Sequence, residues 1–515
     1  MESRVKKSFL NARTNLIFYA LVLGVTFISR RAFLEILGKD FVGLTTTLSN
    51  MLGLMNLAEM GVGAAIGYML YKPLFERDTA KINQIISVFG YIYNRIGLAV
   101  LGIAVIVSCF LPLIFSRTSI PMGVIFFAYY SFLGSSLLSY FANYRQLLLG
   151  ADQKQYVVTT YIQSANILRL LIQTGLAYYT SNLYVWVAME MTFSVIYSII
   201  LNRRIAKTYP WLKSSVREGK SLFRQFPEVV KYTKQLFVHR LAGTALYNLS
   251  PVLIYAYTSL KMVAYYTNYS LIIEKVFLLI TQIIGSVQAG VGHLVAQNDK
   301  DRTHKVYWEL TALYYFIAIV VVISIYHLID PFISLWIGKN YILPNITLVI
   351  ILINLFIRIT RIANESFIYA HGLFYDVWAP LTEAAINISL SIAGGIFLGL
   401  NGVLLGSTVS LICIVMVWKP YFLFRDGFKQ SIMNYIPKIA LNYLIFLFTI
   451  GATYYLKGFI PIDPSESYWQ WIKYALLIFG MTGIISFAFM YVSVKGMRDI
   501  TFRFARLIKS RLRRS

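Results

Sequence analysis

Charged residues, cysteine and histidine are all scarce in this 515-residue sequence. Only 13% of the residues are charged, whereas 58% are hydrophobic and the mean hydropathy is +0.64. This balance excludes a single soluble domain and indicates an integral membrane protein. The only two cysteines, Cys109 and Cys413, lie in apolar runs, which excludes a disulfide framework and predicts two small core residues. The five histidines lack metal-ligand spacing and no Walker motif is present, so neither a metal site nor ATP hydrolysis is predicted.

Long apolar runs recur along the whole chain. A bilayer core of about 30 Å needs roughly 20 apolar residues per helix. The first run, 15–36, is too long for a signal peptide and lacks a cleavage site, so we expect it to be a span. The polar breaks predict an all-α polytopic membrane protein with about 14 transmembrane helices, at 14–36, 44–70, 84–115, 120–147, 156–180, 183–203, 236–259, 263–296, 305–329, 344–370, 376–399, 401–424, 434–456 and 468–494.

The net charge of +25 is explained by membrane topology and does not require a nucleic-acid partner. If both termini are cytoplasmic, thirty-three of the 47 basic residues fall on the cytoplasmic side and six on the outer side. This asymmetry is the positive-inside pattern, and it supports an even number of spans. The basic tail from Lys495 can lie on anionic lipid as an amphipathic stretch.

One hydrophilic segment, 203–235, divides the first twelve spans into six and six, which suggests duplication. Weak similarity between 163–175 and 383–395 agrees with parallel repeats around a central cavity. The predicted parts are an N-terminal six-helix bundle at 1–203, a cytoplasmic linker at 204–235, a C-terminal six-helix bundle at 236–430, transmembrane helices 13 and 14 at 431–494, and a basic cytoplasmic tail at 495–515.

Several basic residues remain inside the predicted spans, where a charge costs on the order of 3 kcal/mol. Some share a helical face with other polar residues, and these are candidates to line a cationic cavity: Arg169, Arg240, Lys275, Arg358 and Arg361. Each of them alone is equally compatible with pairing with an acid or with reaching an interface. Together they favour a cavity for an anion such as phosphate or pyrophosphate.

Two acids in these spans have specific expectations. Glu365 follows Arg361 by four residues and can pair with it, which leaves Arg358 as the freer cation. Glu59 stands beside Gly61, Gly63 and Gly67, small residues that suit close helix packing. It can be a counter-ion to Arg31, a proton carrier, or a neutral hydrogen-bonding group.

Four stretches resemble the polysaccharide-transport branch of the multidrug/oligosaccharidyl-lipid/polysaccharide (MOP) exporter superfamily, the O-antigen-type flippases. They are RAFLEILGKDFVG at 31–43, LAEMGVGAAIGYMLYKPL at 57–74, the Glu383, Asn387 and Ser391 stripe, and NGVLLGSTVS at 401–410. Arg31 stands where the family motif has its arginine, so the resemblance adds it to the cationic lumen candidates.

The resemblance implies a MATE-like fold and translocation of an undecaprenyl-pyrophosphate-linked oligosaccharide across the bacterial inner membrane by alternating access. Such transport serves O-antigen, capsule or exopolysaccharide synthesis, with a polysaccharide polymerase and a chain-length regulator as partners beside the membrane lipids. It implies no cofactor, although coupling to H+ or Na+ is known in the superfamily. The acids to test for that coupling are Glu59, Glu365 and Glu383.

Three other functions compete with this interpretation. A multidrug cation exporter of the same superfamily predicts an acidic lumen and two fewer spans. A lipid II flippase also has fourteen spans and a pyrophosphate substrate. A membrane glycosyltransferase or polymerase needs large outer loops, but the predicted outer loops are short and no catalytic site is visible, so we expect no enzyme.

Overall fold

The computed structural model describes residues 4–55, 62–152, 154–226, 249–297, 299–373 and 375–512. Over these ranges the regular structure is helical and contains no β-strand, which confirms the all-α prediction. The chain divides into two compact units, unit 1 at Met1–Ala264 and unit 2 at Tyr265–Ser515.

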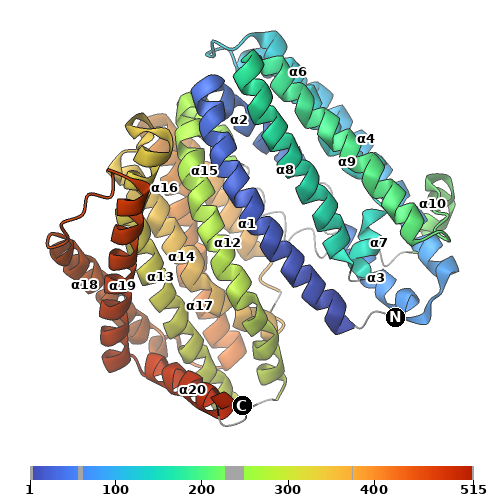
Figure 1. Cartoon of the computed structure of the whole chain (residues 1–515). Coiled ribbons are helices and arrows are strands. Elements are labelled where there is room, and N and C mark those ends of the chain that lie inside the picture. Colours follow the sequence, from blue (N-terminus) through green and yellow to red (C-terminus); the bar gives the residue numbers. More distant parts are fainter. Residues whose placement is uncertain are drawn as a thin grey trace. The chain divides into compact units, whose positions relative to one another are not determined.

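Unit 1 is built from long helices with a few short ones at their ends. Its described helices are α1 (Arg4–Ile36), α2 (Lys39–Met55), α3 (Val62–Glu76), α4 (Thr79–Ser108), α5 (Leu111–Ile114), α6 (Met122–Phe141), α7 (Gln146–Ala151), α8 (Gln155–Thr180), α9 (Leu183–Thr208) and α10 (Val216–Leu222). Helix α1 packs along α8, and α9 packs between α8 and α6 (Figure 1).

The first half of the predicted linker folds back onto unit 1. The side-chain amide of Asn83 on α4 donates to the carbonyl oxygen of Trp211 over 3.2 Å and accepts from the backbone N–H of Lys213 over 2.7 Å. Gly219 on α10 lies against the carbonyl oxygen of Ser87, where a Cβ atom would clash. Helix α10 therefore caps the beginning of α4.

A buried tyrosine closes the same end of unit 1. The hydroxyl of Tyr209, which follows α9, donates to Oδ2 of Asp152 over 2.8 Å. Burial, and then the negative charge of Asp152, raise the pKa of Tyr209 well above its ordinary value. The hydroxyl therefore keeps its proton and acts as a donor, while Lys154 pairs with the same carboxylate at 2.7 Å.

Unit 2 is also a bundle of long helices. They are α12 (Leu260–Ala296, which begins in the last residues of unit 1), α13 (Lys300–Ile337), α14 (Asn345–Ala370), α15 (Trp378–Leu398), α16 (Leu400–Ser410), α17 (Lys419–Phe422), α18 (Ile436–Lys457), α19 (Tyr468–Ser493) and α20 (Lys495–Leu512). Two π-helical segments, Leu411–Trp418 and Leu423–Phe428, join α16 and α17 into one continuous span. Helix α13 packs against α14, α19 and α20 (Figure 1).

Helices α15 and α16 form a tight hairpin. Gly399 turns the chain with a φ of 54°, a backbone angle that glycine adopts most readily. The backbones touch at Gly394 and Gly402, where a Cβ on either residue would meet the backbone of the other. Asn387 on α15 donates to the hydroxyl of Ser407 over 2.8 Å. Small residues thus hold this helix pair together, as is common between membrane helices.

Eleven of the described helical segments are long and apolar enough to cross a membrane, and each overlaps one of the predicted spans. Of the other three predicted spans, 44–70 and 236–259 include residues outside the described ranges. The third, at 156–180, corresponds to α8, which is 26 residues long but carries a polar stripe. The chain is therefore a multi-pass membrane protein.

The prediction that the cysteines are core residues is wrong. Cys109 and Cys413 are both free and exposed. Apolar runs in a membrane helix include the outward face as well as the packed face, so hydrophobic context did not indicate burial.

Candidate functional site

Unit 1 contains a cavity of about 350 Å³ between its helices. Its wall carries five hydroxyl groups, from Thr26, Ser29, Thr45, Thr46 and Ser49. Charged and amide groups come from Arg30, Arg169, Gln173 and Glu190. Polar groups in the middle of membrane helices face a cavity or one another because lipid cannot hydrogen-bond to them. This cavity is therefore the first candidate site.

Arg169 on α8 is held in the cavity wall by two partners. Its guanidinium pairs with the carboxylate of Glu190 on α9, and Nη2 donates to Oδ1 of Asn166 over 2.6 Å. Asn166, Arg169 and Gln173 are spaced by three and four residues, so they lie on one face of this helix. Both Arg169 and Glu190 are mostly buried, so the pair exposes little charge to the outside of the unit.

Two charged residues of the cavity were not among the predicted site residues. Glu190 is the one charged residue of the apolar segment 183–201. A lone acid in an apolar segment was also the reason for examining Glu59, so the sequence could have indicated Glu190 in the same way. Arg30 directly precedes Arg31, and only the packing of α1 shows that Arg30 lines the cavity. The wall therefore holds two guanidinium groups and one carboxylate.

The aromatic part of the wall has a fixed geometry. The ring of Trp186 packs edge-on against Phe33 and Phe41, with centroids 5.4 and 5.3 Å apart. The Nε1 donor of Trp186 and the Oε1 acceptor of Gln173 are buried, and neither has a hydrogen-bond partner within the described part of the chain. A buried donor and a buried acceptor left open beside one cavity are compatible with a hydroxyl-rich ligand or with water.

Arg31, the candidate taken from the family resemblance, pairs with Glu35 one turn further along α1. The distance from Nε to Oε1 is 2.9 Å, and both side chains are about half exposed, at 50% and 51%. Glu59, the partner proposed for Arg31, and the candidate Arg240 lie outside the described residues. Those two predictions remain predictions.

In unit 2, Arg358 is not the freer cation, and that prediction is wrong. Its guanidinium makes two hydrogen bonds to the carboxylate of Glu274 on α12, 2.5 and 2.9 Å long. The ring of Phe277 lies 4.1 Å below the guanidinium carbon. Lys275 directly follows Glu274 in the sequence, but the carboxylate of Glu274 accepts from Arg358 on α14. Lys275 itself is partly buried on α12.

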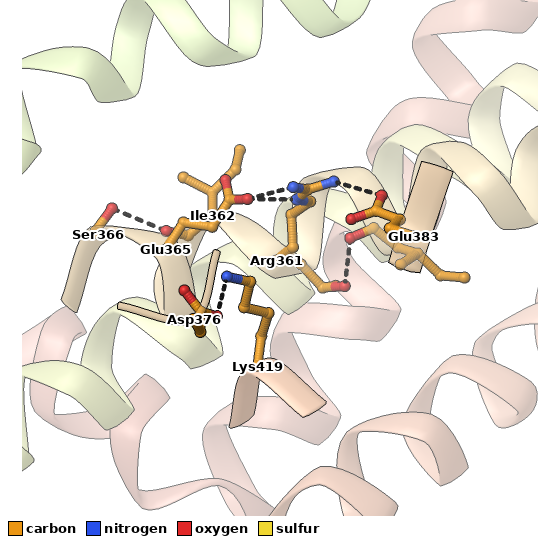
Figure 2. Close-up of polar contacts among 9 residues, drawn as sticks. Arg361, Ile362, Glu365, Ser366, Asp376, Glu383 and Lys419 are labelled. Atoms are coloured by element: carbon orange, nitrogen blue, oxygen red, sulfur yellow. Dashed lines mark hydrogen bonds and ion pairs between the residues drawn. The ribbon is translucent and has the colours of Figure 1, made fainter. Parts of the chain in front are cut away.

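Arg361 connects two acids from two helices (Figure 2). Its Nε donates to Glu365 over 2.7 Å, which confirms the predicted pair on α14. Its Nη1 lies 3.9 Å from the carboxylate of Glu383 on α15, and that side chain is only 9% exposed. One guanidinium thus serves two carboxylates, so this cluster carries an excess of negative charge when both acids are ionised.

A second pair lies near this cluster in unit 2 (Figure 2). Nζ of Lys419 is 2.5 Å from Oδ2 of Asp376, and the Asp376 side chain is only 3% exposed. Lys419 lies within the predicted span 401–424 and begins α17, between the two π-helical segments. The pair ties this span to the segment that leads into α15. No group of three or more metal-binding side chains occurs in the part of the chain that the structure describes.

Known protein structures match this fold, although no protein-family model and no curated protein matches the sequence. The chain has the fold of the MATE and MurJ-like transporters of the MOP superfamily. The lipid II flippase MurJ, in an inward closed conformation, aligns with a TM-score of 0.68 at 16% identity, over 96% of this chain and 100% of MurJ. An inward-facing multidrug resistance MATE family transporter aligns with a TM-score of 0.59 at 11% identity, over 81% of this chain and 99% of its own. The Vibrio cholerae MATE transporter VcmN, in the bent form, aligns with a TM-score of 0.50 at 14% identity, over 82% and 98%.

Proposed function

We propose that this protein is a flippase for an undecaprenyl-pyrophosphate-linked oligosaccharide. It moves the repeat unit from the cytoplasmic to the outer leaflet of the bacterial inner membrane by alternating access, for surface polysaccharide synthesis. The observation that carries the proposal is the cavity of unit 1, in which guanidinium groups stand among hydroxyl and amide groups. Guanidinium groups bind phosphate oxygens in a bidentate manner, and the other groups suit sugar hydroxyls.

The extent of the fold match favours a flippase over a multidrug exporter. The MATE transporter covers 81% of this chain, whereas MurJ covers 96% of it and is matched over its full length. The charge of the cavity also favours a flippase. Its two arginines, Arg30 and Arg169, outnumber its one acid, Glu190, whereas a cation exporter needs an acidic lumen. Both observations support a large lipid-linked anion as the substrate class.

Lipid II transport is the second candidate function. It is favoured by the TM-score of 0.68 with MurJ, which exceeds the 0.59 with the MATE transporter. Lipid II and an oligosaccharide repeat unit share a lipid pyrophosphate and differ in the sugar part. The experiment must therefore identify the intermediate that accumulates.

We further propose that both termini are cytoplasmic and that a polysaccharide polymerase and a chain-length regulator act with this protein. Transport is proposed to use an H+ or Na+ gradient, with Glu365 and Glu383 as the acids concerned. Their sharing of Arg361 supports this part of the proposal, because the second carboxylate needs a compensating cation.

The proposed function is tested by removing the Arg169–Glu190 ion pair of the cavity wall in full-length protein. We expect the double variant Arg169→Gln/Glu190→Gln to reach the membrane, because no buried charge is left without its partner. Loss of hydrogen bonds to a charged ligand should reduce surface polysaccharide by roughly tenfold or more. Arg95→Ala is the control, since Arg95 is exposed on α4 and does not line the cavity.

Mass spectrometry of the lipid-linked intermediates in the variant cells distinguishes the candidates. Accumulation of a lipid-pyrophosphate oligosaccharide other than lipid II supports the proposal. Accumulation of lipid II alone favours the second candidate. Normal surface polysaccharide in the double variant rejects the cavity as the substrate site.

A further inference from the structure

The last described helix, α20, is amphipathic and is not part of the cavity or the ion-pair clusters. It begins at Lys495, directly after α19 ends at Ser493, so it leaves the membrane-spanning bundle at one end of unit 2. In Figure 1 it runs at a steep angle to α19. A helix in this place lies near the level of the lipid headgroups.

One face of α20 is docked on α13 by close packing. Met497 and Ile500 are buried. Gly496 lies against the carbonyl oxygen of Trp308, where a Cβ atom would clash. These contacts fix both the position and the rotation of the helix.

Two ion pairs hold the same face. Nη2 of Arg503 lies 2.7 Å from Oε2 of Glu309 on α13, a carboxylate that is 98% buried, with 2% of the side chain exposed. Asp499, the only acid of α20, lies 3.6 Å from Nζ of Lys305. The negative charge of α20 is therefore directed at α13, and its outer face carries basic residues but no acid.

The outer face carries an aromatic ring among basic groups. Arg498, Phe502 and Arg506 are spaced by four residues and form one exposed stripe, with Lys495 beside it. Phe502 is 53% exposed. The face toward α13 is buried, whereas this stripe stays exposed, and the ring of Phe502 contacts that of Tyr491 at the end of α19, at 6.5 Å between centroids.

We propose that this stripe is a docking surface for the anionic headgroups of the membrane in which the protein sits. The basic groups would bind lipid phosphates, and Phe502 would insert at the boundary of the acyl chains. Charge complementarity and the position directly after a membrane span favour lipid over a soluble partner. This surface is independent of the proposed transport function.

The test places a nitroxide spin label on the outer face of full-length protein. Cys109 and Cys413 are replaced by Ser, and Phe502→Cys carries the label. The protein is reconstituted in nanodiscs of phosphatidylglycerol or of phosphatidylcholine alone, and the label's accessibility to oxygen and to a water-soluble nickel complex is measured. In phosphatidylglycerol we expect the label to lie in the lipid and to be shielded from the nickel complex. In phosphatidylcholine we expect it to be several-fold more accessible to nickel. A label at Glu466, an exposed loop residue between α18 and α19, should be accessible to nickel in both.

A charge variant tests the role of the basic residues. Lys495→Gln/Arg498→Gln/Arg506→Gln should abolish the difference between the two lipids at position 502. Neutralising an exposed basic group on unit 1, Arg217→Gln/Lys220→Gln on α10, should leave that difference unchanged. A label that stays in water in both lipids, as it would if a protein partner normally covers the stripe, overturns the proposal. Equal insertion in both lipids also overturns it, because anionic headgroups would then not be recognised.

Discussion

Both terminal nitrogens of Arg358 on α14 donate to the carboxylate of Glu274 on α12, and the two residues are 84 positions apart in the sequence. The guanidinium is mostly buried, at 16% exposed, whereas the carboxylate is 42% exposed. Phe277 covers the guanidinium at 4.1 Å. Such a bidentate pair fixes the two helices relative to each other in unit 2 and leaves little of the arginine's charge for a ligand.

Breaking this pair from one side should destabilise unit 2. Arg358→Gln is expected to lower the free energy of unfolding by roughly 1–3 kcal/mol, because hydrogen bonds to a charged group are lost. Glu274→Gln should cost less, since its carboxylate is partly exposed. Thermal unfolding of the purified protein in detergent measures both.

The double variant Arg358→Gln/Glu274→Gln completes the cycle. We expect it to be more stable than the sum of the single variants predicts, by about 1 kcal/mol, because no unpaired charge remains. Strict additivity would show that the two side chains do not interact. Retained transport in the double variant would place Arg358 among structural residues and remove it from the substrate candidates.

The hairpin of α15 and α16 should tolerate no side chain at its contact. In Gly402→Ala the new methyl group would meet the carbonyl oxygen of Gly394, so the helices must separate. Overpacking of this kind costs about 1–3 kcal/mol. Gly480→Ala on α19 is the matched control, since a Cβ there has nothing within 4 Å. Equal thermal stability of the two variants would contradict the close approach of the two backbones.

Local periodicity predicted those features that depend on neighbours along the chain. The long apolar runs gave the spans, and the four-residue spacing of Arg361 and Glu365 gave their ion pair. The polar stripe of α8 was also visible, since Arg169 and Gln173 lie one turn apart and both line the cavity. Such features follow from helix geometry alone.

Contacts between helices could not be predicted in this way. Arg358 pairs with Glu274, which is distant in sequence, and Arg169 pairs with Glu190 on the following helix. Which face of a membrane helix meets protein and which meets lipid is decided by packing, because both faces are apolar. The exposed Cys413 is an example of a residue whose apolar surroundings indicated burial.

The last prediction concerns Glu383, which shares Arg361 with Glu365. Arg361 bonds closely to Glu365, while its Nη1 stays 3.9 Å from Glu383, so the buried Glu383 is the less compensated acid. A proton removes this excess negative charge by neutralising the carboxyl group itself. We therefore expect Glu383 to exchange a proton during transport. The nearby Lys419 is already paired with Asp376. The helix that faces α15 carries no charged residue between Leu400 and Trp418.

Infrared difference spectra of the purified protein after a step in pH test this expectation. A carbonyl band of a buried protonated carboxyl group should appear, should be lost in Glu383→Gln, and should persist in Glu466→Gln, whose carboxyl group is exposed. Glu383→Gln should also make transport insensitive to a pH gradient, because the neutral amide mimics the protonated acid permanently. If the band survives in Glu383→Gln but disappears in Glu365→Gln, the proton belongs to the acid that Arg361 holds more closely. If the band survives in both variants, neither acid of this cluster takes up the proton.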